Sequence, residues 1–174
     1  MATYNIDPAH SSAQFTVRHM MITNVHGSFS AVAGTVVFDP DDPSKCSIEG
    51  AIDATTVNTQ EAQRDTHLKS ADFLDVEKYP TITFKSTKVE TDGDDYRVTG
   101  DLTIHGVTKS VVLEVDAPSG EAKDPWGNWR IGTSARTKIK RSDFGLDFNA
   151  VLETGGFLVG DDLKIEIDVS LIKS

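Results

Sequence analysis

The chain has 174 residues, a length that suits one domain able to bury roughly 70% of the surface its unfolded form would expose. Its 27 acidic and 17 basic side chains leave a net charge of −10, which argues against nucleic acid as a partner and against attraction to anionic lipid headgroups. The single cysteine, Cys46, excludes an internal disulfide, and no apolar run approaches the roughly 20 residues of a transmembrane segment.

The opening residues MATYNIDPAH contain neither the basic segment nor the apolar segment of a secretory signal peptide. We therefore expect a cytoplasmic protein, unless a leader has been removed from the chain. No internal repeat or low-complexity linker divides the sequence, so we expect a single domain over residues 1–174.

Alternation of apolar and polar residues predicts strands along the first third of the chain. We expect them at residues 13–19, 32–38 and 46–54, with residues 21–26 forming the connection between the first two. Residues 60–69 contain good helix formers and do not alternate, so they predict one short helix. Pro80 disfavours continuation of helix and begins the next strand.

Five more strands are predicted in the remainder, at residues 82–86, 95–104, 107–115, 129–139 and 163–171. His105-Gly106 indicates a tight turn between the second and third of these. Eight strands joined mostly by short turns predict an all-β protein whose antiparallel up-and-down sheet closes into a barrel.

The inward face of this barrel mixes large and small residues. An eight-stranded barrel either fills with side chains or holds one small ligand, so inward glycine, alanine, serine and threonine favour a lumen. An alternative is that the glycines only mark bends and bulges. Strand parity gives these candidate ligand-binding residues: Val36, Ile48, Phe84, Leu102, Ile131, Ala135 and Ile165.

Few residues offer catalytic or metal chemistry. The five histidines lack close metal-ligand spacing, although His19 and His26 could meet across a turn, and we expect no metal site. No G-x-S-x-G motif surrounds a serine, and Cys46 falls on an inward strand face as a small hydrophobe. His19 is the titratable side chain placed by parity on an apolar face, as a core residue or as a polar contact for a ligand.

Several stretches together carry a family resemblance. They are Phe15-Thr-Val-Arg-His-Met20, Gly27-Ser-Phe29, His67-Leu-Lys-Ser-Ala-Asp-Phe-Leu-Asp75 with Tyr79-Pro80, Gly100-Asp-Leu-Thr-Ile-His-Gly-Val-Thr-Lys109 and Arg141-Ser-Asp-Phe-Gly-Leu146. In this order, over residues 3–172, the chain resembles the YceI family of polyisoprenoid-binding, lipocalin-like proteins.

The resemblance implies an elongated eight-stranded antiparallel lipocalin-like barrel with one or two short helices, which binds one amphipathic lipid and commonly forms a homodimer. Such a lipid would be an isoprenoid quinone, a polyprenyl compound or a long-chain amide. Many relatives are periplasmic. By position, the resemblance places Phe15, Val17, His19 and Phe29 on the pore, Leu68 and Phe73 at one end, and Phe144 near the barrel wall.

We interpret the chain as a non-catalytic carrier or store for a small hydrophobic ligand, with no cofactor of its own. Each buried methylene contributes roughly 0.8 kcal/mol, so chain length alone provides affinity. One alternative is an enzyme acting on a lipid-like substrate in the same lumen, with His19 or His105 as acid or base. A second is a structural or stress protein with a filled barrel and an acidic, soluble exterior.

Overall fold

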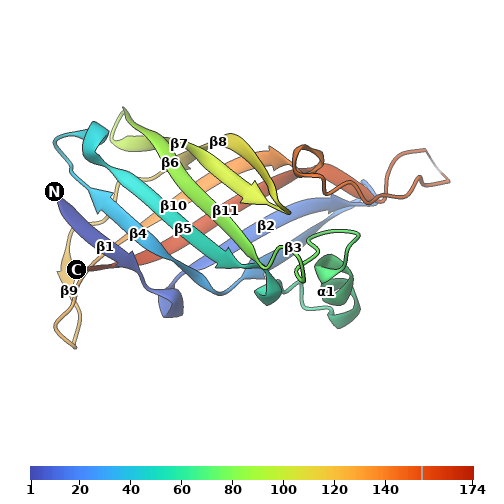
Figure 1. Cartoon of the computed structure of the whole chain (residues 1–174), viewed down its shortest axis with the longest axis horizontal. Coiled ribbons are helices and arrows are strands. Elements are labelled where there is room, and N and C mark those ends of the chain that lie inside the picture. Colours follow the sequence, from blue (N-terminus) through green and yellow to red (C-terminus); the bar gives the residue numbers. More distant parts are fainter. Residues whose placement is uncertain (154) are drawn as a thin grey trace.

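The computed structural model describes residues 1–153 and 155–174, and strands make up most of them (Figure 1). The strands are β1 (Ala2–Ile6), β2 (Ser12–His19), β3 (Thr23–Phe29), β4 (Val32–Phe38), β5 (Ser47–Asp53), β6 (Thr81–Asp92), β7 (Asp95–Ile104), β8 (Val107–Val115), β9 (Ala122–Lys123), β10 (Trp129–Lys140) and β11 (Val159–Lys173). The helix is α1 (Ala62–Lys69), and short 3₁₀ turns occupy Pro8–His10, Pro43–Lys45, Ala54–Thr56 and Arg141–Phe144.

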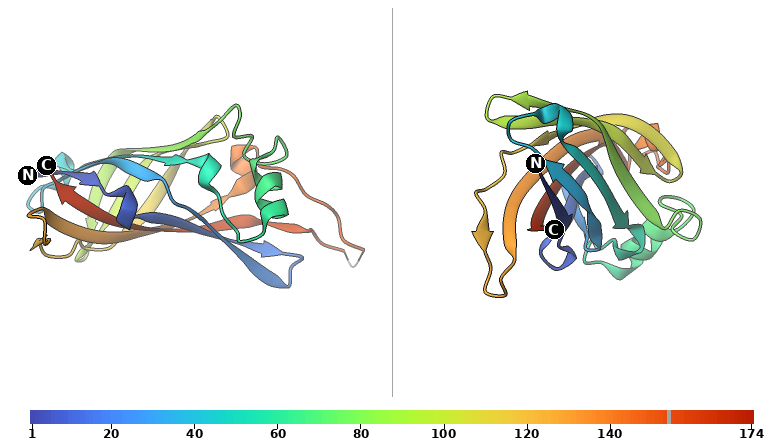
Figure 2. Two further views of the ribbon diagram at one scale, coloured as in Figure 1. Left: turned by 90° about the horizontal axis from the view of Figure 1, so that it is seen from below. Right: turned by 60° about the vertical axis from the view of Figure 1, so that its left-hand side comes forward.

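The sheet closes on itself as an eight-stranded antiparallel barrel. Its ring runs β11–β1–β4–β5–β6–β7–β8–β10 and returns to β11 through a long β10–β11 ladder. The two views of Figure 2 show the sheet curled about the long axis of the molecule. The predicted all-β barrel and its antiparallel order are confirmed, and α1 falls inside the predicted helical segment 60–69.

Two pairs of strands act as single long strands in the barrel wall. β1 pairs with the C-terminal end of β11, whereas β2 pairs with its N-terminal half, and the turn at Pro8–His10 separates them. β3 and β4 form the second long strand: β3 pairs with β2, and β4 pairs with β1. The expectation that residues 21–26 form a connection is wrong, because β3 already begins at Thr23.

The β8–β10 contact is the shortest ladder of the ring. Its register holds two residue pairs, Val115 with Ala135 and Glu114 with Arg136. Side chains extend the seam: the Thr137 hydroxyl donates to the Val112 carbonyl at 2.9 Å, and the Thr133 hydroxyl donates to the Asp116 carbonyl at 2.7 Å. Hydroxyl groups here replace backbone donors where the two strands diverge.

A small apolar cluster lies at the end of the barrel near both chain termini. Tyr4, Ile131 and Leu171 are buried together, with Phe38 packed against them. The Tyr4 hydroxyl donates to Glu121 Oε1 at 2.8 Å. Burial, reinforced by this carboxylate, raises the pKa of Tyr4 to about 12, so its hydroxyl remains a donor at neutral pH.

Beside this end, Arg130 joins three separate segments. Its Nη1 and Nε atoms each lie 2.7 Å from a carboxylate oxygen, of Asp7 and Asp124 respectively. Hydrogen bonds from Arg130 and from His10 lower the pKa of Asp7 to about 2, and the hydrogen bond from Arg130 also lowers the pKa of Asp124. The 3₁₀ turn after β1 is thereby tied to β10 and to the β9–β10 connection.

We predict that Arg130→Gln raises the pKa of Asp7 from about 2 toward 3.8. A depressed folded-state pKa stabilises the protein above the unfolded pKa, and that stabilisation is lost as pH falls through the folded value. The variant should therefore unfold more easily than the wild type near neutral pH, and the difference should shrink as the pH falls from about 3.8 to about 2. Carboxyl NMR titration and denaturation at several pH values measure both effects; a difference independent of pH would contradict this account.

Candidate functional site

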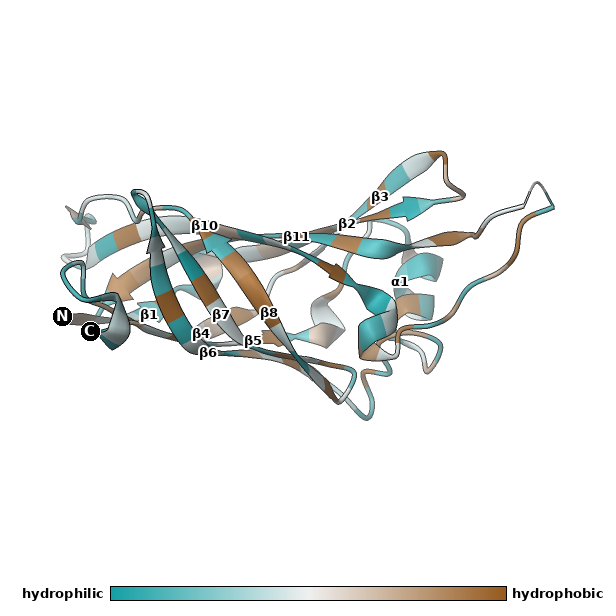
Figure 3. Cartoon of the chain, turned by 90° about the horizontal axis from the view of Figure 1, so that it is seen from above, coloured by the Kyte–Doolittle hydropathy of each residue, from teal (hydrophilic) through white to brown (hydrophobic). Residues whose placement is uncertain are grey.

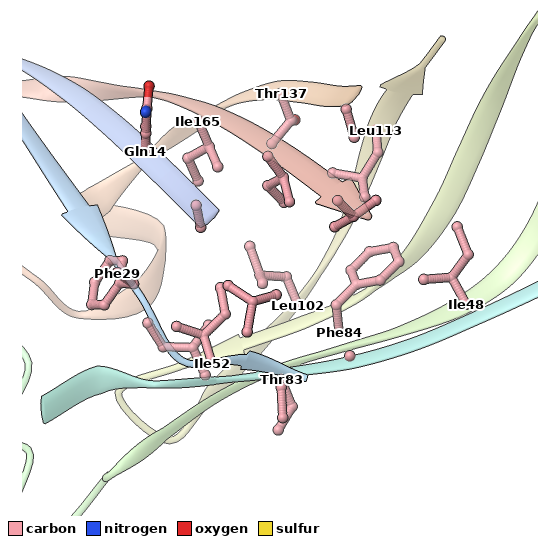
Figure 4. A pocket seen from close by; sticks show the side chains of 18 of the residues that line it. Gln14, Phe29, Ile48, Ile52, Thr83, Phe84, Leu102, Leu113, Thr137 and Ile165 are labelled. Carbon is pink, nitrogen blue, oxygen red and sulfur yellow. The ribbon is translucent and has the colours of Figure 1, made fainter. Parts of the chain in front are cut away.

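An elongated cavity of about 270 Å³ occupies the barrel interior. Its walls come from both ends of the barrel: Ile6 and Leu171 lie near the chain termini, whereas Leu68 and Phe73 lie in the helical segment. Figure 4 shows part of the lining, in which Phe84, Leu102 and Ile165 point into a shared space. The barrel is therefore hollow and lined almost entirely by hydrocarbon.

Most of the candidate ligand-binding residues predicted from the sequence line this cavity. They are Phe15, Val17, Phe29, Val36, Ile48, Leu68, Phe73, Phe84, Leu102, Ile131, Ala135 and Ile165. Their contact with a ligand stays a prediction, but their gathering around one space is what strand parity and the resemblance led us to expect.

His19 and Phe144 lie elsewhere. His19 is the last residue of β2, half-buried, and it is not part of the lining. The register between β2 and β11 shifts between Val159 and Leu163. Beyond Val17, alternation along β2 therefore no longer predicts which side chains face the barrel interior. Phe144 is 1% exposed and packs within the largest core cluster behind the lining.

The wall hydroxyls along the β8–β10 seam already have partners. The hydroxyls of Thr133 and Thr137 donate to carbonyls along the β8–β10 seam, which leaves their methyl groups as lining. Gln14 and Thr83 belong to the wall but point away from the space that the apolar side chains share (Figure 4). Because these groups are satisfied or turned outward, the cavity has little affinity for water and favours an apolar guest.

Arg141 is the charged residue among the described residues of the lining. Its side chain is 5% exposed, and its guanidinium donates to the backbone carbonyls of Leu146, Phe148, Val159 and Gly160. Burial lowers its pKa, an effect that the charges of Asp161 and Asp147 oppose. These bonds use four of its five N–H groups and hold both ends of the 147–158 segment against the barrel.

The sequence contained a signal for Arg141. Its position has the same parity as Ile131 and Ile139, which are buried on β10, so alternation alone would place a positive charge on the inner face. Ile6, Val159 and Leu163 also line the cavity and were not among the sequence candidates. Ile6 belongs to a five-residue strand whose alternation is too short to stand out in the sequence.

The small residues contribute to the wall in two ways. Gly50 and Ala135 do line the cavity, as a lumen requires. At Gly27 and Gly100, by contrast, the space that a Cβ would need is already occupied by the rings of Phe15 and Phe84. These two glycines therefore make room for a neighbouring ring rather than for a ligand, a role that neither interpretation of the glycines from the sequence included.

The helical segment covers one end of the cavity. Leu68 lies in α1, and Phe73 and Leu74 lie in the turn after the helix. All three side chains belong to the cavity lining. The His67 ring packs edge-on against Phe73 at 5.0 Å and against Phe148 at 4.7 Å between ring centroids. This aromatic contact joins α1 to the 147–158 segment above the cavity.

Histidines form no joint site in this region. His26 lies exposed on β3, and its Nδ1 is 3.0 Å from the hydroxyl of Thr16 on β2, the strand that ends at His19. His105 lies in the predicted tight turn with φ of 55°, and its Nδ1 is 3.3 Å from the Phe144 carbonyl. Within residues 1–153 and 155–174, no cluster of three or more His, Cys, Asp or Glu is arranged to hold a metal ion.

No helix in the described part of the chain is long and apolar enough to cross a membrane.

We predict that Gly27→Ala lowers the free energy of unfolding by about 1–3 kcal/mol, because the new Cβ overlaps the Phe15 ring and forces it away from the wall. The displaced ring enters the cavity and weakens binding of an apolar fluorescent probe. Gly120→Ala is the matched control, since its Cβ meets no atom within 4 Å. Equal effects of the two changes would show that the ring contact is unimportant.

Replacing Arg141 with methionine should lower the free energy of unfolding by about 3 kcal/mol, because four carbonyl groups lose their donor. Arg141→Lys should recover less than half of that loss, since an ammonium cannot reach four acceptors arranged around a planar guanidinium. Chemical denaturation measures both variants. Full recovery by lysine would mean that the charge matters rather than the hydrogen bonds.

Comparison with known proteins agrees with this architecture. The chain is 44% identical over 147 residues to Protein YceI of Escherichia coli O17:K52:H18, a match that covers 83% of this chain and 76% of that protein. Among solved structures, BcnA of Burkholderia cenocepacia superposes with a TM-score of 0.80 and 25% identity, covering 95% of this chain and 98% of the other.

A polyisoprenoid binding domain from Saccharophagus degradans has the same fold, with a TM-score of 0.70 and 17% identity over the whole of both chains. The YceI-like domain family matches residues 4–171, nearly the full length. The closed barrel, its interior cavity and this match together show that the chain belongs to the YceI-like domain family.

Proposed function

We propose that this protein binds and carries, or stores, an amphipathic long-chain lipid inside its barrel, without chemical turnover. The observation that carries the proposal is the continuous apolar cavity, which reaches from Ile6 and Leu171 at the terminal end to Leu68 and Phe73 under the helical segment. Its long axis follows the barrel, so an extended chain fits better than a compact ring system. A polyisoprenoid binding domain from Saccharophagus degradans has the same fold, which supports a ligand of this class.

The lining indicates what the ligand offers to the protein. Against aliphatic and aromatic walls, each buried methylene of the ligand improves the binding free energy by roughly 0.8 kcal/mol. Such walls discriminate weakly between chains of similar width. The polar lining groups Thr133, Thr137 and Arg141 already bond to the barrel. An isoprenoid quinone, a polyprenyl compound and a long-chain amide all meet these requirements, because their affinity resides in the tail.

The positions of His19 and His105, the two histidines considered as acid or base, support a non-catalytic role. An acid–base pair would need a titratable group within hydrogen-bonding reach of the bound lipid. His19 lies outside the lining and His105 bonds the Phe144 carbonyl in a hairpin turn. The cytoplasmic location and the homodimer expected from the sequence stay predictions.

The first test is mass spectrometry of the organic extract from natively purified protein. We expect one long-chain lipid in stoichiometric amount and chemically intact. An empty protein that also takes up no added lipid would refute carriage, and a consistently modified lipid would favour an enzyme.

The second test fills the cavity. Ala135→Phe places a ring in the lumen from β10 and should reduce lipid retention about tenfold or more while the barrel still folds. Lys138→Phe adds the same ring to an exposed position of the same strand and should leave retention unchanged. Lipid retention is measured by extraction, and circular dichroism of each variant shows whether the barrel has folded. Unaffected retention in Ala135→Phe would place the ligand outside the barrel.

A further inference from the structure

Two segments project together beyond the barrel at the end where α1 lies (Figures 1 and 2). They are the turn of the β2–β3 hairpin and the loop before β11. Both carry large apolar side chains in water, and Figure 3 shows hydrophobic residues on these projections. The exposed fractions are 41% for Met20, 63% for Met21, 67% for Ile22, 77% for Val151 and 55% for Phe157, and we call these five residues the apolar tip.

The two segments form one surface. The Met20 amide donates to the Leu158 carbonyl at 2.7 Å. The Met21 side chain lies directly against Gly156, where any larger residue would overlap its sulfur. Arg141 holds the loop from below through the carbonyls of Phe148 and Val159. The tip is therefore attached to the barrel at several points.

The β2–β3 hairpin turn places two methionines in a backbone conformation that residues with long side chains disfavour. Met20 and Met21 have φ of 52° and 59°, and the Ile22 amide donates to the His19 carbonyl at 3.0 Å. Met20 and Met21 are the central residues of a β-turn from His19 to Ile22, inside the three-residue connection between the paired residues His19 and Thr23. Both have positive φ, a conformation that Asn and Gly adopt most easily. Residues with long side chains are strained there, and such outliers cluster at functional positions.

Charge sets the hairpin apart from the rest of the molecule. The chain contains 27 acidic residues, yet residues 8–38 contain neither aspartate nor glutamate. That stretch includes all of β2 and β3, together with Arg18, whose guanidinium donates to Asn24 Oδ1 and to the Met21 carbonyl. In the loop, residues 148–158 contain one carboxylate, Glu153. The tip thus escapes most of the negative charge that would repel it from a lipid headgroup region.

The cavity reaches this end of the barrel. Val17 and Val159 belong to its lining, and they lie three residues before Met20 and two residues after Phe157. The two strands that lead to the tip, β2 and β11, therefore also carry part of the cavity lining.

We propose that the apolar tip inserts into the surface of a phospholipid bilayer with zwitterionic headgroups, and that the protein loads or releases its lipid while docked there. This inference rests on the proposed lipid-carrying function. A narrow projection of five apolar side chains suits insertion between lipid headgroups, whereas a stable protein interface requires roughly 20–30 residues from each partner. The overall charge of −10 makes the docking independent of anionic lipid.

The test is flotation of the full chain with phosphatidylcholine vesicles, comparing the wild type with Met20→Asn/Met21→Gly. Asn-Gly relieves the strained turn, so the melting temperature should rise by roughly 2–4 °C. Loss of two apolar side chains should lower partitioning into the vesicles roughly tenfold. Opposite changes in stability and in membrane binding are the signature of a docking role, because a merely structural turn would change stability alone.

Two controls remove exposed apolar side chains elsewhere. Trp126→Ser acts on the β9–β10 hairpin beside the chain termini, and Val112→Ser acts on the barrel wall; these side chains are 80% and 43% exposed. Neither should change partitioning. Both native tryptophans lie in that distant hairpin region, so Ile22→Trp in a Trp126→Phe/Trp129→Phe background supplies a reporter at the tip, and its emission should shift to the blue when vesicles are added.

Three results would overturn the proposal: no flotation of the wild type, unchanged flotation of the Asn-Gly variant, or an equal loss in Trp126→Ser. If sedimentation instead shows that the Asn-Gly change converts a dimer to a monomer while the wild type does not float, the tip pairs with a second copy of the chain.

Binding of N-phenyl-1-naphthylamine without vesicles separates this proposal from the function on which it rests. Met20 and Met21 do not belong to the cavity lining, so the Asn-Gly variant should bind this probe as the wild type does. Wild type that binds the probe but does not float refutes docking alone. Wild type that floats but binds no apolar probe or lipid refutes the carrier function.

Discussion

The structure depends on the pairing of β11 along both of its edges. This strand of 15 residues forms the long ladder with β10 on one side and pairs with β1 and then β2 on the other. Closure of the sheet therefore occurs at β11, and closure is what removes unpaired strand edges and encloses an interior. The alternation from Leu163 to Leu171 directs one set of β11 side chains into that interior, so the strand that closes the barrel also lines the cavity.

A dry cavity also requires that the wall satisfy its own polar groups. Where β8 and β10 diverge, the hydroxyls of Thr133 and Thr137 bond to carbonyls of the neighbouring strand and segment. Arg141 does the same at the other end of β10, on a larger scale, by donating to four carbonyls. An unsatisfied donor at any of these positions would attract water or a polar ligand, and the cavity would lose its preference for hydrocarbon.

Strand parity predicted the barrel and most of the lining, because inward and outward positions differ in hydrophobicity along β4 to β8, β10 and β11. It failed where alternation does not follow burial. β3 was missed because its inward position Gly27 has no side chain, the space being filled by Phe15 from the partner strand. His19 was placed on the pore because parity was extended past the register shift opposite β2. Arg141 was overlooked although its parity pointed inward, since a charge on an apolar face is recognisable only together with its acceptors.

Several departures from simple barrel patterning lie at one end of the molecule. The register shift in β11, the buried Arg141 and the left-handed Met20 and Met21 all lie where β2, β3 and the 147–158 loop extend past the closed ring. A sequence selected only to close a barrel would end its strands at the ring and place Asn-Gly in the turn. Concentration of strained backbone and exposed apolar groups at a single cavity end is expected of a functional region, since both features lower stability and persist only where something else maintains them.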